Sequence, residues 1–261
     1  MQVAGGAPME LTHKVGDDSC QAPVVEQGAE AHLAGLHRRI DVELPDTGRA
    51  AGRTRLAPAV TKGDENFAFV LKGILSPSEC ADWVQQSEER GYGTALINTG
   101  QRQVLDTDTR KSGRNIFDSP MDATELFTRL QPHLPKTIRR RRLAGLNERL
   151  RFLRYDPGEY FAPHMDGHYS RPDGSETSLL TVMVYLNAGG GANFSGGETR
   201  FVDWRDESKG TDVVPGLGDC LVFSHPILHE GAEVRAGRKY AVRTDVMYSN
   251  HATTEATSQC V

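Results

Sequence analysis

The sequence lacks the features that mark several large classes of protein. Among its 261 residues there are only four cysteines, and none form a Cys-x-x-Cys pair. Neither a disulfide framework nor a thiolate metal site is therefore expected, and any metal would be held by His and carboxylate groups. No apolar run approaches the roughly 20 residues of a membrane-spanning helix, and a secretory signal is absent from the first residues. We expect a soluble, non-secreted, cytoplasmic protein, with nuclear localisation as the alternative.

Basic residues are not in excess either. The 30 Lys and Arg are outweighed by 35 Asp and Glu, which gives a formal net charge of −5. A strongly basic balance is the electrostatic footprint of nucleic-acid binding, so neither nucleic acid nor a membrane is an expected partner. The local exception is the run Arg139–Arg142. It invites a nuclear-targeting or phosphate-binding interpretation, but we favour a solvated helix end.

Regular structure is predicted to begin only near residue 63. Residues 1–62 are rich in Gly, Ala and charged residues and lack sustained apolar periodicity, so we expect a mostly disordered extension. Phe67–Leu71 has the composition of a strand. A capping Ser, a Pro at the first helical position and a Glu at the third predict a helix over Pro77–Arg90. Ser119-Pro120 is a second helix start signal.

From about residue 150 the chain changes to short runs rich in β-branched and aromatic residues, separated by Gly, Pro and Asp. Such runs predict an antiparallel sandwich or barrel. We expect a mainly β fold of the α+β type: residues 63–148 supply a strand and supporting helices, residues 149–250 form the barrel, and residues 251–261 are a tail. The expected strands are Leu150–Tyr155, Tyr160–His164, Leu179–Leu186, Glu198–Val202, Cys220–Phe223 and Lys239–Met247.

Three residues have the spacing of a metal site. Residues i and i+2 of a strand point to the same face, so His164 and Asp166 can present an imidazole and a carboxylate to one ion. His229, 65 residues downstream, follows an apolar strand and can supply a third ligand. Two His and one carboxylate leave three octahedral positions open, which suits non-haem Fe(II) with a chelating cosubstrate and O2. His225 is the rival third ligand.

A basic residue follows the distal histidine. Lys239 lies ten residues past His229 and opens the last strong strand. A fixed cation there can neutralise the remote carboxylate of a dicarboxylate cosubstrate. Arg243 shares the same strand face and is the alternative cation. Whichever of the two does not meet the cosubstrate can pair with Asp245.

With these positions in place, the sequence resembles the Fe(II)/2-oxoglutarate-dependent dioxygenases, and within them the prolyl 4-hydroxylase-like group. The resemblance covers about residues 67–250. Arg154-Tyr155, followed by Pro157-Gly158, is similar to the family's lead-in to the His-x-Asp strand, and Ser195–Thr199 resembles its Gly-rich hairpin. His-x-Asp alone is a weak pattern, whereas its combination with the distal His and the following basic residue is specific.

The resemblance implies a double-stranded β-helix (jelly-roll) barrel flanked by N-terminal helices, with Fe(II) held by His164, Asp166 and His229. It also implies 2-oxoglutarate as the cosubstrate, O2 as the oxidant and ascorbate as a reductant. Lys239 and Tyr185 are expected on the C5 carboxylate of 2-oxoglutarate. The full set of residues expected around the cosubstrate is Lys239, Tyr185, Tyr155, Thr181 and, as the alternative cation, Arg243.

The implied reaction is hydroxylation of an aliphatic C–H, with a prolyl residue of a peptide or protein as the expected substrate. Oxidation of a free small molecule is the alternative. A non-catalytic barrel serving as an interaction module is a remote alternative, because it would predict the loss of at least one ligand. Thr109–Asn115 is similar to the substrate-side segment of prolyl hydroxylases, which makes Arg110, Arg114 and Asn115 candidate substrate residues. The sequence makes no prediction of the oligomeric state.

Overall fold

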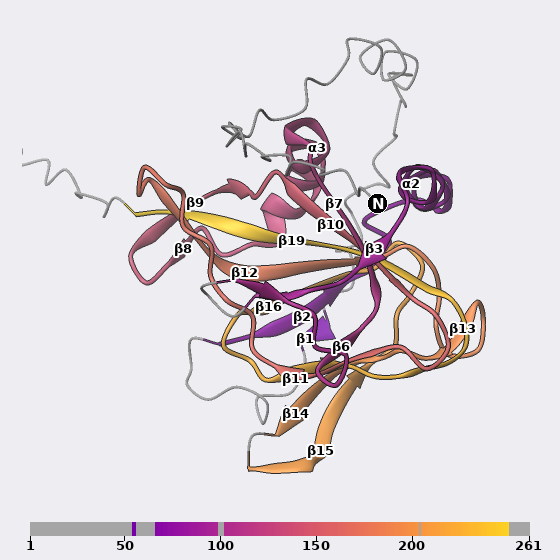
Figure 1. Cartoon of the computed structure of the whole chain (residues 1–261). Helices are drawn as coiled ribbons and strands as arrows, with labels where there is room; N and C mark the ends of the chain where they lie inside the picture. The colour runs from indigo at the N-terminus through magenta and orange to yellow at the C-terminus, as the bar shows by residue number, and fades with distance from the viewer. Residues whose placement is uncertain (1–53, 56–65, 99–101, 204, 251–261) are drawn as a thin grey trace, which may run out of the picture. The chain divides into compact units, whose positions relative to one another are not determined.

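The computed structural model describes residues 54–55, 66–98, 102–203 and 205–250 (Figure 1). Of the expected disordered extension, only Thr54–Arg55 falls within these ranges, and it forms a short strand that pairs with Val70 and Phe69. The expected tail, residues 251–261, lies outside them. None of the described helices has the length and apolar character needed to cross a membrane.

Antiparallel strands make up nearly half of the described chain, and each strand expected from the sequence is present to within three residues at either end. The helical elements are α2 (Pro77–Arg90), α3 (Pro120–Leu130) and the 3-10 turn η2 (Gln131–His133). The strands are β1 (Thr54–Arg55), β2 (Ala68–Leu71), β3 (Gly93–Thr94), β4 (Ile97–Asn98), β5 (Gln103–Val104), β6 (Arg110–Lys111), β7 (Gly113–Asp118), β8 (Thr137–Ile138), β9 (Arg141–Leu146), β10 (Arg149–Tyr155), β11 (Tyr160–His164), β12 (Glu176–Tyr185), β13 (Phe194–Gly196), β14 (Thr199–Asp203), β15 (Asp206–Val213), β16 (Cys220–Ser224), β17 (His229–Gly231), β18 (Val234–Gly237) and β19 (Lys239–Ser249).

Two sheets form the body of the protein. The major sheet has the order β1-β2-β16-β12-β19-β10-β7-β3, with β9 also paired to β19, and the minor sheet has the order β15-β14-β17-β11-β6. In Figure 1 the helices α2 and α3 lie on one side of the major sheet and the minor sheet lies on the other. This is the double-stranded β-helix expected from the sequence, although strand pairing among the described residues leaves two sheets rather than a closed barrel.

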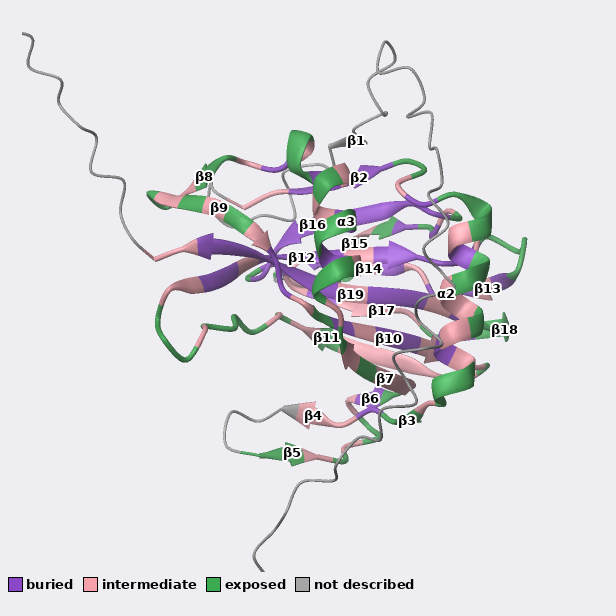
Figure 2. Ribbon diagram, turned by 90° about the horizontal axis from the view of Figure 1, so that it is seen from above, coloured by how far each residue is buried: buried purple, intermediate pink, exposed green. Residues whose placement is uncertain are grey.

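The period of two along the strands divides the major sheet into two faces. In β12, Val182 and Val184 pack in the cluster that contains Leu126 of α3. Tyr185, on the other face, packs with Phe201 of the minor sheet. Figure 2 shows the central strands as buried and the outer surfaces of the helices as exposed. The face away from the helices is therefore the one that can contribute side chains to a site between the sheets.

Both predicted helices begin at the expected caps. In α2, the backbone N–H of Glu79 donates to the Ser76 hydroxyl, and the backbone N–H of Ser76 donates to the Glu79 carboxylate, so the capping box is complete. Ser119 caps α3 in the same position. Arg129 near the end of α3 then pairs with Glu79 at 2.6 Å, which joins the first turn of α2 to the last turn of α3.

The arginine run Arg139–Arg142 does not end a helix as expected. Arg139 and Arg140 form the turn between β8 and β9, with φ values of 50° and 62°, and Arg141 and Arg142 are the first residues of β9. These left-handed conformations fit a tight turn between paired strands. The segment continues into β9 because β9 pairs with the long strand β19, and that tertiary pairing has no signal in the local sequence.

Truncation of Phe152 tests the core between the helices and the major sheet. Phe152 is 2% exposed, stacks on Phe117 with ring centroids 5.1 Å apart, and lies 5.8 Å from the Trp83 ring. We expect Phe152→Ala to lower the free energy of unfolding by about 3–5 kcal/mol, because it leaves a large cavity. Urea denaturation measures this loss. Leu105→Ala is the control: Leu105 is 61% exposed, so a comparable loss there would contradict the assignment of the core.

Candidate active site

The three predicted metal ligands converge between the sheets. His164 ends β11 and His229 begins β17, and these strands pair with the two histidines directly opposite each other. Asp166 follows two residues after His164. Its carboxylate oxygens lie 3.8 Å from His164 Nε2 and 3.7 Å from His229 Nε2. The three ligand atoms lie within 4.8 Å of one another, a separation that a single ion can bridge.

Each histidine is oriented by its own backbone. The Nδ1 atom of His164 is 2.9 Å from the carbonyl oxygen of Ala162, and Nδ1 of His229 is 2.9 Å from that of Ile227. A carbonyl oxygen only accepts, so the proton resides on Nδ1 and the Nε2 lone pair faces the centre of the site. Burial, together with the neighbouring His229, lowers the pKa of His164 to about 3. Both imidazoles are neutral donors suited to a metal ion.

Asp166 is held from two sides. The hydroxyl of Thr181 donates to its Oδ2 at 2.5 Å, and Nη2 of Arg243 lies 3.0 Å from its Oδ1. Burial alone would raise the pKa of Asp166, but the charge of Arg243, aided by the Thr181 hydrogen bond, outweighs it and holds the pKa well below its usual range. The carboxylate is therefore ionised. Two neutral imidazoles and one carboxylate, each with an orienting partner, fit a divalent ion such as Fe(II).

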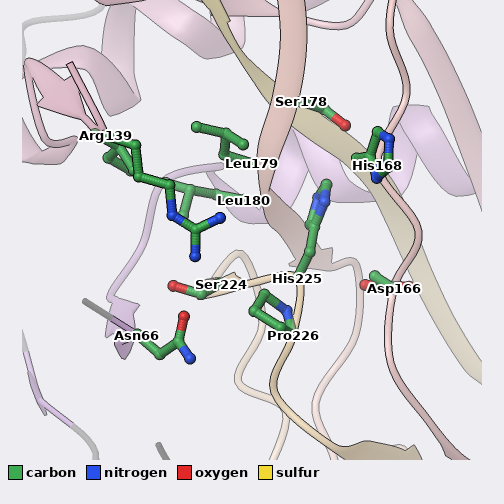
Figure 3. Close-up of a pocket in the computed structure, with 11 residues that line it drawn as sticks. Asn66, Arg139, Asp166, His168, Ser178, Leu179, Leu180, Ser224, His225 and Pro226 are labelled. Atoms are coloured by element: carbon green, nitrogen blue, oxygen red, sulfur yellow. The ribbon is translucent and has the colours of Figure 1, made fainter. Parts of the chain in front are cut away.

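His225, the rival third ligand, does not join this cluster. Its Nε2 is 3.7 Å from Oδ1 of Asp245, and neither ring nitrogen has a hydrogen-bond partner among the described residues. It lines a separate cavity of about 220 Å³ behind Asp166, together with His168 and Ser178 (Figure 3). The geometry brings His229, rather than His225, to the other two ligands.

Lys239 lies in the same large cavity as the metal residues, which has a volume of about 650 Å³. Its ammonium group donates to the carbonyl oxygen of Gly197 at 2.7 Å and lies 5.2 Å from the Tyr155 ring and 5.7 Å from the Tyr185 ring. It is 4% exposed, and its burial lowers the pKa to about 8. No carboxylate among the described residues pairs with it, so an incoming carboxylate would find an uncompensated cation.

The other predicted cosubstrate residues have different surroundings. Tyr185 donates its hydroxyl to Thr199 at 2.7 Å, behind Lys239, and burial raises its pKa. Thr181 contacts Asp166 and does not line the large cavity. Arg243 pairs with Asp166 and with Asp245 at 3.1 Å. Of the two candidate cations, Lys239 is the one whose charge is left available.

Of the predicted substrate residues, two line the large cavity and one does not. Arg110 and Arg114 line the large cavity. Asn115 does not: its amide donates to the carbonyl oxygens of Gly91 and Ser87 at the end of α2. Other cavity residues were not predicted as site residues, among them Arg151 and Phe161. Arg151 could have been predicted from the sequence, because its position in the strand places it on the same face of β10 as Tyr155.

Comparisons with known proteins agree with this geometry. Residues 150–244 match the model of the 2OG-Fe(II) oxygenase superfamily. A curated relative, described as probable prolyl 4-hydroxylase 6 of Arabidopsis thaliana, is 26% identical over 175 residues, which are 60% of this chain and 57% of that protein. The chain thus spans somewhat more than half the length of the curated relative it matches.

A solved structure with a TM-score above 0.5 shares the fold. A prolyl hydroxylase from Trichoplax adhaerens, in complex with a hypoxia inducible factor peptide fragment, is 17% identical with a TM-score of 0.52, covering 69% of this chain and 82% of that one. The viral collagen prolyl hydroxylase from Paramecium Bursaria Chlorella virus-1, in its 2OG complex, is 23% identical with a TM-score of 0.47, covering 69% and 95%. These matches support the resemblance identified from the sequence: residues 150–244 are similar to the 2OG-Fe(II) oxygenases, and the curated relative is a prolyl 4-hydroxylase by description.

Proposed function

We propose that this chain hydroxylates an aliphatic C–H of a prolyl residue in a peptide or protein, using Fe(II), 2-oxoglutarate and O2. The observation that carries the proposal is the convergence of His164, Asp166 and His229 in one cavity with the buried, carboxylate-free cation Lys239. Prolyl specificity is supported by the relatives, which are named as prolyl hydroxylases. Ascorbate as the reductant is part of the same proposal.

Each residue has a role that follows from its contacts. His164, Asp166 and His229 hold Fe(II), which when bound with 2-oxoglutarate supplies O2 activation coupled to release of succinate and CO2. Lys239 binds the remote carboxylate of 2-oxoglutarate through a charge-assisted hydrogen bond. Thr181 and Arg243 fix the rotamer and ionised state of Asp166.

Two alternatives make different predictions. A small-molecule oxygenase would share this site and differ only in what enters the cavity. A non-catalytic module would dispense with at least one ligand or with the cation, yet all four residues are present and lie in or beside one cavity. The proposal therefore favours an enzyme, and the substrate decides between its two forms.

The test combines a binding assay with a search for the product. Anaerobic Fe(II) titration of the full chain, followed by 2-oxoglutarate and then O2, is expected to show both binding steps and succinate release. Mass spectrometry of a proteome treated with the enzyme is expected to show one added oxygen on proline. Protein that binds neither iron nor 2-oxoglutarate would refute the enzyme class. Turnover with oxygen added only to a small metabolite would instead favour the alternative substrate.

A further inference from the structure

The cavity in front of the metal residues carries an unusual number of arginines. Five arginines line it. Arg149 is paired with Asp118, and the other four are Arg110 of β6, Arg114 of β7, Arg151 of β10 and Arg243 of β19. Arg151 and Arg243 lie directly opposite each other on paired strands, an arrangement in which like charges destabilise a sheet. Cations this close together are stabilised by neighbouring anions. The structure shows which of these arginines pair with a carboxylate.

Two of the four arginines share a single carboxylate. Nη1 of Arg151 lies 3.1 Å from one oxygen of Asp245, and Nη2 of Arg243 lies 3.1 Å from the other. Arg243 also pairs with Asp166, but Asp166 is a proposed metal ligand, so its negative charge would be shared with the ion. The remaining acidic side chain of the cavity, Glu230, is directed toward Arg200 at 3.9 Å.

The other two arginines pair with no carboxylate among the described residues. Nε of Arg110 donates to the Ser112 hydroxyl, and its guanidinium lies over the Phe161 ring. Arg114 donates to the Leu96 carbonyl and, at 3.3 Å, to the Gln103 amide oxygen. Burial, then repulsion from Arg110, Arg151 and Arg243, lowers the pKa of Arg114. Positive charge thus exceeds negative charge in this part of the cavity.

Binding of the metal and cosubstrate would not remove this excess. The charges of Fe(II) are opposed by Asp166 and by the two carboxylates of 2-oxoglutarate, and Lys239 offsets the one negative charge that remains. Asp245 offsets one of the pair Arg151 and Arg243. The guanidiniums of Arg110 and Arg114 are still uncompensated, and burying such charges without anions is costly.

The position of Arg110 links this excess to the reacting centre. Its guanidinium lies 4.5 Å from the centroid of the Phe161 ring. Phe161 in turn stacks on the imidazole of His164, with ring centroids 3.6 Å apart. An anion bound by Arg110 is therefore separated from a metal-ligating imidazole by one aromatic ring, which is within the reach of a single amino-acid residue of a bound substrate.

We propose that Arg110 and Arg114 bind a carboxylate of the substrate, so that the enzyme acts on a prolyl group with an acidic group close by. This inference rests on the proposed function and names its substrate class. Planar guanidinium groups match carboxylates in geometry as well as charge. The carboxylate can belong to a neighbouring Asp or Glu of a peptide or to the substrate's own terminal carboxyl group, and the experiment separates these two sources.

The experiment measures binding to the full chain loaded anaerobically with Fe(II) and 2-oxoglutarate. One library of short peptides has a central proline flanked by Asp or Glu, and a matched library has Asn or Gln at the same positions. N-acetyl-L-proline and N-acetyl-L-prolinamide form the second pair. We expect the acidic member of at least one pair to bind about 10- to 100-fold more tightly, the usual value of a hydrogen bond to a charged group. The pair that responds identifies the source of the carboxylate.

Variants connect the preference to these residues. The double substitution Arg110→Gln with Arg114→Gln is expected to abolish the preference, and Arg114→Glu to reverse it toward a library with Lys at the flanking positions. Arg149→Gln is the matched control, because Arg149 also lines the cavity but its guanidinium is paired with Asp118 through two contacts. The preference is expected to survive in that variant.

Equal binding within both pairs, no binding of either acidic member, or a preference that survives the double substitution would overturn the inference. These outcomes are distinct from failure of the proposed function. That failure would appear earlier in the same experiment, as a wild-type protein that does not take up Fe(II) and 2-oxoglutarate.

Discussion

Replacing Asp166 by alanine is expected to abolish succinate release and to weaken Fe(II) binding by more than about 100-fold, the upper range for loss of a residue that only orients a metal ligand. Asp166 supplies the only carboxylate of the proposed ligand set and lies within 3.8 Å of both imidazoles. Anaerobic Fe(II) titration and a succinate assay measure the two effects.

Loss of folding must be separated from loss of the ligand, because Asp166→Ala also removes an anion from the buried Arg243. Asp166→Asn is the matched variant: it keeps the shape of the side chain and an acceptor for Thr181 while removing the charge. Both variants should give native circular dichroism spectra. Substantial succinate release by folded Asp166→Asn would show that this carboxylate is not a metal ligand.

Lys239→Ala is expected to raise the dissociation constant for 2-oxoglutarate by about 10- to 100-fold, while Fe(II) binding changes little. The physical reason is the loss of a charge-assisted hydrogen bond in a buried site. Arg243→Ala should have the smaller effect on 2-oxoglutarate, since its guanidinium is already engaged by Asp166 and Asp245. Isothermal titration of the Fe(II)-loaded protein under anaerobic conditions compares them. A larger cosubstrate defect in Arg243→Ala would reverse the assignment.

The pH dependence gives an independent check on Lys239. Its pKa in the folded protein is lowered to about 8 by burial, so the ammonium form predominates below this pH and the neutral amine above it. Affinity for 2-oxoglutarate should therefore be highest below pH 8 and fall above it, by up to about tenfold per pH unit. Lys239→Arg, whose charge persists in this range, should remove the decline. A flat wild-type profile would contradict a role for the Lys239 charge.

The local sequence predicted the ends of the fold's regular elements better than it predicted their partners. The caps at Ser76 and Ser119 were visible because capping depends on residues three positions apart. The polar strand β15, Asp206–Val213, was missed because it lacks apolar alternation. It forms a strand through pairing with β14 in space, which no local pattern encodes.

In the site too, residues close in the sequence could be placed together, whereas the pairing of distant strands could not be predicted. His164 and Asp166 could be placed together from their spacing, and His229 could be added only as the residue whose distance along the chain suited the chemistry. What brings it there is the pairing of β11 with β17. The roles of Lys239 and Arg243 were equally compatible with their shared strand face. They differ in the structure because Asp166 and Asp245 lie beside Arg243 and not beside Lys239.

The two faces of the major sheet have a consequence for which positions of this chain can vary. Phe152, Val182 and Val242 pack on the helices, whereas their sequence neighbours Arg151, Met183 and Arg243 line the cavity. Side chains that point to the cavity do not enter the core beneath it. The charge of the cavity wall at Arg151 can therefore change without altering the volume of the core that packs on the helices.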